Sequence, residues 1–128
     1  YKRQIYNTAY EKFGKFTYEM WRACRLVVDT GIHAFGWTRD EAVSIMEENT
    51  SLSIPEINTE IDRYISWPGQ ALAYKTGEMK IRELRSKAER ELGDLFDIRQ
   101  FHEVILEIGT VTLPILEERV NKYIISSK

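Results

Sequence analysis

The chain of 128 residues is long enough to bury a core, and 43% hydrophobic with 30% charged residues is the composition of a folded globular protein. Its net charge of −2 comes from 18 basic and 20 acidic residues that are well mixed, so no basic stripe indicates a nucleic-acid-binding surface. No apolar run approaches the roughly 20 residues of a membrane-spanning helix. We expect residues 1–128 to form a single helical domain, or a helical fragment of a longer protein.

Apolar residues recur at helical spacing along almost the whole chain, which predicts an all-α fold with about six helices. The first predicted helix covers about residues 8–32, and Gly36 ends that region. Its predicted apolar side contains Tyr10, Phe13, Met20, Trp21, Cys24, Val27, Val28 and Ile32. Cys24 is the only cysteine, so no internal disulfide is possible and we expect a buried, unreactive thiol.

Capping boxes at Thr38–Glu41 and Ser53–Glu56 predict the start of the second and third helices. The fourth predicted helix runs from about residue 70 to 92, after a Pro-Gly break, and contains Gly77. A glycine inside a helix costs about 1 kcal/mol relative to alanine, so we expect Gly77 to permit a close helix contact. The residues expected to face inward on this helix are Tyr74, Ile81, Leu84, Ala88 and Leu92. Asp97 and Thr112 begin the fifth and sixth helices.

Four polar residues share one face of the first predicted helix: Arg22, Arg25, Asp29 and His33. At 100° per residue they fall within a sector of about 80°, so Asp29 can reach both arginines and orient the histidine. Helical periodicity alone favours an ordinary solvated face with salt bridges. The flanking Trp21, Leu26 and Trp37 favour a partly buried polar network instead, and both interpretations stay open.

A second group of polar and aromatic residues surrounds the Trp-Pro-Gly break before the fourth helix: Tyr64, Gln70, Tyr74 and Lys75. Free N–H groups at the start of that helix make this a favourable place for an anionic group. The alternative is a helix–helix corner with packed aromatic side chains.

No zinc site can be assembled from the sequence. The segment HEVIL at residues 102–106 begins like the zinc motif His-Glu-x-x-His, but Leu106 stands where the second histidine ligand is required. His33 also lacks a histidine four residues further on. We therefore expect no metal ligand in this chain.

Two long stretches resemble the C-terminal part of a large bacterial family, the domain of unknown function 885 (DUF885). They are YEMWRACRLVVDTGIHAFGWTRDEAVSIMEENT and EIDRYISWPGQALAYKTGEMKIRELRSKAERELGDLFDIRQFH, and the similarity extends over about residues 13–123. Members of the family are several times longer, mostly helical, and regarded as zinc metallopeptidases. Many of them are secreted, periplasmic or lipoproteins.

The resemblance implies that this chain is the C-terminal helical segment of a zinc-dependent peptidase. The family's His-Glu-x-x-His helix and third glutamate ligand lie before the matched region, so zinc is expected in the intact protein and no activity in the segment alone. The resemblance implies that Arg22 or Arg25 binds a carboxylate or carbonyl of a peptide substrate, and that His33 or Tyr64 hydrogen-bonds the oxyanion. Further candidates for substrate binding are Asp29, Gln70, Tyr74 and Lys75.

The alternative is a helical module without enzymatic activity that binds a partner and shares ancestry with the peptidases. In either case, helices that pack against absent parts of a longer protein would expose apolar surface. We therefore expect the isolated chain to self-associate.

Overall fold

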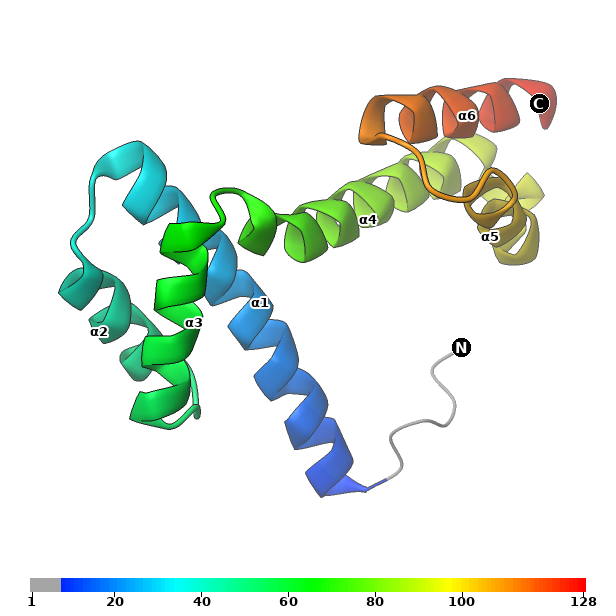
Figure 1. Ribbon diagram of the computed structural model, residues 1–128. Helices are drawn as coiled ribbons and strands as arrows, with labels where there is room; N and C mark the ends of the chain where they lie inside the picture. Colours follow the sequence, from blue (N-terminus) through cyan, green and yellow to red (C-terminus); the bar gives the residue numbers. More distant parts are fainter. Residues whose placement is uncertain (1–7) are drawn as a thin grey trace. The chain divides into compact units, whose positions relative to one another are not determined.

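The computed structural model describes residues 8–128 and confirms the predicted all-α fold. Six α-helices and two short 3-10 turns make up this part of the chain (Figure 1). The described residues divide into two compact units, residues 8–76 and 77–128, and each unit has its own hydrophobic core. The single domain predicted from the sequence stays a prediction.

Three α-helices and one 3-10 turn build the first unit: α1 (Ala9–Phe35), α2 (Arg39–Asn49), α3 (Ile54–Ser66) and η1 (Gln70–Leu72). Thr8, Thr38 and Ser53 begin the three α-helices, each with the reciprocal capping-box hydrogen bonds to a glutamate three residues later. Gly36 ends α1 in the left-handed conformation, at φ 71°, as predicted. The last helical residue, Phe35, lies three residues beyond the predicted residue 32.

The core of the first unit forms where α2, α3 and η1 pack on the C-terminal half of α1 (Figure 1). Its buried hydrophobic residues are Cys24, Val28, Ala42, Met46, Ile57, Ile61, Tyr64 and Ala71. Cys24 is buried as predicted, and burial raises the pKa of its thiol, which keeps the thiol protonated and poorly reactive.

The N-terminal half of α1 differs from the prediction. Three residues expected on its apolar side are exposed there: Tyr10, Phe13 and Met20. Val27, in the C-terminal half of α1, is exposed as well. The helical spacing is correct, but α2 and α3 cover only the later turns of α1, so this half has no packing partner among the described residues of its unit. Together with the exposed Phe16, the residues Tyr10, Phe13 and Met20 form what we call the aromatic face of α1.

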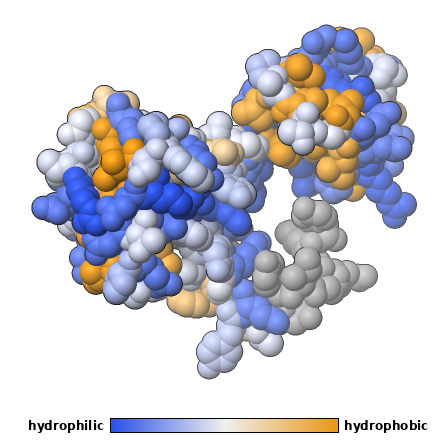
Figure 2. Space-filling model, in the orientation of Figure 1, coloured by the Kyte–Doolittle hydropathy of each residue, from blue (hydrophilic) through white to orange (hydrophobic). Residues whose placement is uncertain are grey.

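The second unit consists of most of α4 (Ala73–Leu92), the turn η2 (Gly93–Leu95), α5 (Ile98–Leu106) and α6 (Leu113–Ser126). Its buried core contains Leu84, Ala88, Leu92, Phe101, Leu116, Val120, Tyr123 and Ile124. Two residues expected to face inward on α4, Tyr74 and Ile81, are exposed because the core contacts begin only at Leu84. Apolar residues also gather on the visible face of this unit (Figure 2). No helix of the described chain is long and apolar enough to cross a membrane.

Two glycines inside helices have opposite surroundings. A Cβ atom at Gly31 would lie 2.1 Å from the ring of Trp37, so the indole packs directly on the backbone of α1. Gly77 has no atom within 4 Å of such a Cβ, which contradicts the close helix contact predicted for it.

We expect Gly31→Ala to lower the free energy of unfolding of the first unit by about 1–3 kcal/mol, because Trp37 must move away from the new methyl group. Tryptophan fluorescence during urea unfolding measures this unit alone, since Trp21, Trp37 and Trp67 all lie in it. Gly77→Ala is the matched control and should raise the stability of α4 by about 0.5–1 kcal/mol. Circular dichroism measures this change. Equal effects of the two substitutions would contradict the packing of Trp37 on Gly31.

We expect the isolated chain to self-associate through the aromatic face of α1, and its mass in light scattering should rise with concentration. Phe13→Gln combined with Phe16→Gln should shift this equilibrium toward the monomer. Phe35→Gln is the matched control, since Phe35 is also exposed but lies at the other end of α1. A constant monomeric mass over a wide concentration range would contradict the prediction.

Candidate functional site

The two polar groups predicted from the sequence meet in the first unit, through a contact between Asp29 and Gly69. Asp29 is 2% exposed, and both of its carboxylate oxygens lie 3.1 Å from the backbone nitrogen of Gly69. Gly69 has φ 81° and immediately precedes η1. The anionic group predicted at this helix start is therefore a side chain of the protein itself.

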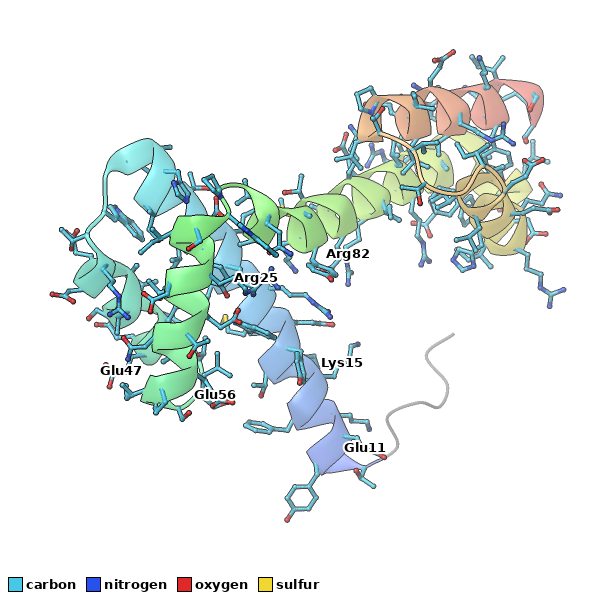
Figure 3. All side chains as sticks on the ribbon, in the orientation of Figure 1. Glu11, Lys15, Arg25, Glu47, Glu56 and Arg82 are labelled. Atoms are coloured by element: carbon cyan, nitrogen blue, oxygen red, sulfur yellow. The ribbon has the colours of Figure 1, made fainter. Side chains whose placement is uncertain are left out.

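Arg25 lies one turn before Asp29 on α1 and is only 5% exposed (Figure 3). Its Nη2 donates a hydrogen bond to Oε1 of Gln70 at 3.1 Å, and its Nε has no hydrogen-bond partner. The guanidinium carbon lies 5.3–5.6 Å from the ring centroids of Trp21, Tyr64 and Tyr74. No carboxylate of the described chain forms an ion pair with Arg25, which is unusual for a buried arginine.

A second arginine joins the same glutamine from α3. Arg63 donates to Oε1 of Gln70 at 3.0 Å and forms an ion pair with Glu60. Glu60 also accepts a 2.7 Å hydrogen bond from the hydroxyl of Tyr64, which in turn accepts one of 3.2 Å from Nε1 of Trp21. Four helical elements, α1, α3, η1 and α4, thus contribute to one network, which we call the Arg25 network.

Burial and hydrogen bonding shift two pKa values in the Arg25 network. Burial, together with the hydrogen bond to the Glu60 carboxylate, raises the pKa of Tyr64 well above its usual value, so its phenol stays protonated. Burial alone would raise the pKa of Glu60, but the hydrogen bonds from Arg63 and Tyr64 and the charges of Arg63 and Arg25 lower it overall. Glu60 is therefore an ionised acceptor at neutral pH.

The other predicted site residues lie at the edge of the Arg25 network. Arg22 is half-buried and stacks on Tyr74, with its guanidinium carbon 5.5 Å from the ring centroid. His33 is exposed, and its Nε2 lies 3.0 Å from the backbone oxygen of Tyr64. Lys75 follows Tyr74 on α4 and is half-buried, outside the set of residues that contact Arg25.

The structure corrects the solvated-face interpretation of the polar stripe on α1. Arg25 and Asp29 are buried because η1 packs over them, and α1 and η1 lie in direct contact. The expected pairing of Asp29 with the arginines and His33 is also wrong, since both of its oxygens accept from Gly69.

Two members of the Arg25 network, Glu60 and Arg63, were not predicted from the sequence. Their spacing carries a signal, because residues three and four apart on a helix face each other and Glu60 precedes Arg63 by three and Tyr64 by four residues. Within residues 8–128 there is no group of three or more His, Cys, Asp and Glu side chains that could hold a metal ion.

A groove of about 520 Å³ adjoins the Arg25 network. It lies between the middle of α1 and the start of α3, and its lining residues are Thr17, Tyr18, Trp21, Leu52, Pro55, Glu56, Thr59 and Glu60. Trp21 and Glu60 belong to both the groove and the network, so a ligand in the groove would contact the network directly.

We expect Tyr64→Phe to lower the free energy of unfolding of the first unit at neutral pH by about 1–2 kcal/mol, since Glu60 and Trp21 each lose a hydrogen-bond partner. The folded-state pKa of Tyr64 lies above the unfolded value near 10. Its contribution to stability is therefore complete below about pH 10 and is lost as the pH rises from there toward the folded-state pKa. The stability difference between the parent and Tyr64→Phe in urea unfolding should narrow above about pH 10, and a difference independent of pH would contradict this assignment.

Known proteins similar to this chain identify its family. No curated protein matches the chain. A crystal structure described as "the putative lipoprotein from Colwellia psychrerythraea" is 44% identical to it, with a TM-score of 0.89 over 91% of this chain. The match covers only 20% of that protein, so the chain spans about a fifth of its length. A family model described as "Bacterial protein of unknown function (DUF885)" matches residues 3–120, and the chain therefore belongs to the DUF885 family.

Proposed function

We propose that the chain is the C-terminal helical segment of a zinc-dependent peptidase and that the Arg25 network forms part of the wall of its peptide-binding cleft. The observation that carries the proposal is the buried guanidinium of Arg25, which has no ion-pair partner and an unpaired Nε. A charge in that position calls for an anionic or strongly polar partner, and a peptide carboxylate or carbonyl supplies one.

The neighbours of Arg25 are arranged to receive such a partner. Tyr74 is 58% exposed and stacks on both Arg22 and Arg25, so a movement of this one ring would uncover the two guanidinium groups. Gln70 accepts from Arg25 and Arg63 through a single oxygen, which leaves its amide group to donate to a carbonyl. His33 and Tyr64 remain the candidates for stabilising an oxyanion in the intact protein.

Zinc would have to be held by residues outside the described part of the chain, because residues 8–128 contain no suitable cluster. The Arg25 network would then bind and orient the substrate beside the metal. The family membership and the length of the matched relative support this division, since four-fifths of that relative lie outside the match. The relative's name also supports a secreted or lipoprotein-anchored location for the intact protein.

The test is peptide hydrolysis by the intact protein that carries this chain. We expect zinc-dependent cleavage, and we expect Arg25→Lys and Arg22→Gln to lower kcat/KM by about 10- to 100-fold through loss of a charged hydrogen bond to the substrate. Arg82→Gln is the matched control and should leave kcat/KM within about twofold, because Arg82 forms only an exposed ion pair with Glu78.

Thermal unfolding of each variant separates a loss of binding from a loss of the fold, and Arg22→Gln remains informative even where the buried Arg25→Lys unfolds. Parental kcat/KM in both variants with unchanged stability would overturn the role of the Arg25 network. An intact protein that binds peptides without zinc and without cleaving them would favour the alternative of a helical binding module.

A further inference from the structure

The groove beside Trp21 has a composition suited to one class of ligand. Its walls are largely apolar, through Leu52, Pro55 and the rings of Tyr18 and Trp21. Of the residues that line it, Glu56 and Glu60 are the only charged ones, and both are acidic. At about 520 Å³ it has the size of a typical small-ligand site, so an extended side chain fits within it.

The negative charge of the groove comes mainly from Glu56. Glu60 forms an ion pair with Arg63 and accepts a hydrogen bond from the hydroxyl of Tyr64. Glu56 has no ion-pair partner in the described chain, and its Oε2 accepts the capping hydrogen bonds from the backbone and hydroxyl of Ser53. Those bonds lower the pKa of Glu56, which therefore stays ionised. Its side chain lies at the start of α3 (Figure 3), and its second oxygen is available to a ligand.

Two aromatic rings stand on the opposite wall. The centroids of Tyr18 and Trp21 are 5.7 Å apart, with a 55° angle between the ring planes. Tyr18 is 57% exposed, so its ring is accessible to a ligand. Tilted rings that face a carboxylate attract a cation, because the ring faces carry negative charge and the carboxylate adds to it.

We propose that this groove binds a basic side chain, an ammonium or guanidinium group on an aliphatic stem, as presented by lysine or arginine in a peptide. The stem packs between Leu52, Pro55 and the rings, and the cationic head lies between the rings and Glu56. Charge complementarity selects this occupant over an anion or a purely apolar group. The proposal concerns binding by residues 8–128 and holds whether or not the intact protein is a peptidase.

Titration of the chain with four small probes tests the proposal. Binding is measured from the NMR signals of Thr17, Thr59 and the Trp21 indole. The probes are n-butylguanidinium, n-butylammonium, n-pentanol and n-pentanoate, which share a similar stem and differ in the charge of the head. We expect the two cations to bind with a Kd of about millimolar order. Their binding should weaken as salt is added, since the site is open to solvent. The alcohol should bind more weakly than either cation, and the anion most weakly of all.

A matched pair of substitutions isolates the charge of Glu56. Glu56→Gln keeps a capping box, since glutamine also serves at that position, but it removes the charge. It should weaken the binding of n-butylguanidinium about two- to fivefold. Glu41→Gln makes the same change at the capping box of α2, outside the groove, and should leave binding unchanged. Tyr18→Leu keeps an apolar side chain but removes the ring, and should weaken the binding of the cation by about two- to fivefold.

Three outcomes would overturn the proposal. Equal binding of n-pentanol and n-butylguanidinium would identify a merely apolar groove. Equal effects of Glu56→Gln and Glu41→Gln would assign the attraction to the overall charge of the protein. The absence of saturable shifts at the lining residues would show that the groove does not bind this class of ligand.

Discussion

The contact between the Asp29 carboxylate and the backbone N–H of Gly69 determines how the polar residues of the first unit are arranged. A carboxylate that is 2% exposed is stable only when hydrogen bonds replace its water, and both of its oxygens accept from this one donor. Gly69 can present its N–H because it adopts φ 81°, which other residues rarely do. The contact holds η1 against α1, and η1 carries Gln70, the residue that links Arg25 and Arg63. Without it, Arg25 would lie on an open helix face.

Trp21 connects the two candidate sites of this unit. The guanidinium of Arg25 stacks on its ring, and its indole N–H donates a hydrogen bond to the hydroxyl of Tyr64. It also lines the groove at the start of α3. Among the described residues, Arg25 in the network has no ion-pair partner, and Glu56 in the groove has none, while Glu60 belongs to both. The two surfaces therefore attract groups of opposite charge, and a peptide is a ligand that carries both kinds of group. A substitution of Trp21 would disturb both sites and could not separate them, whereas Arg22 and Glu56 each belong to one.

Local patterns predicted the helices well, and the polar stripe on α1 only in part. The predicted capping boxes at Thr38 and Ser53 depend on residues three positions apart, so the sequence contains all the required information. Burial of Arg25 depends on η1, more than 40 residues later, and no periodicity in α1 reveals that contact. Periodicity also could not reveal that Tyr10 and Phe13 are exposed. They have the helical spacing typical of a core, but α2 and α3 do not extend to them. The flanking Trp21, Leu26 and Trp37 correctly favoured the buried network over a solvated face.

The energetics of Arg25 favour a role beyond holding the helices together. Burying a guanidinium costs several kcal/mol before compensation, and an apolar residue of similar volume usually stabilises a core at least as well. Here the compensation within the chain is one hydrogen bond to Gln70 and three aromatic contacts, each worth about 0.5–2 kcal/mol, together with the attraction to the charge of Glu60. The unpaired Nε remains an uncompensated cost. A ligand carboxylate or carbonyl would remove that cost on binding, so the energy given up in the folded chain becomes energy available for recognition.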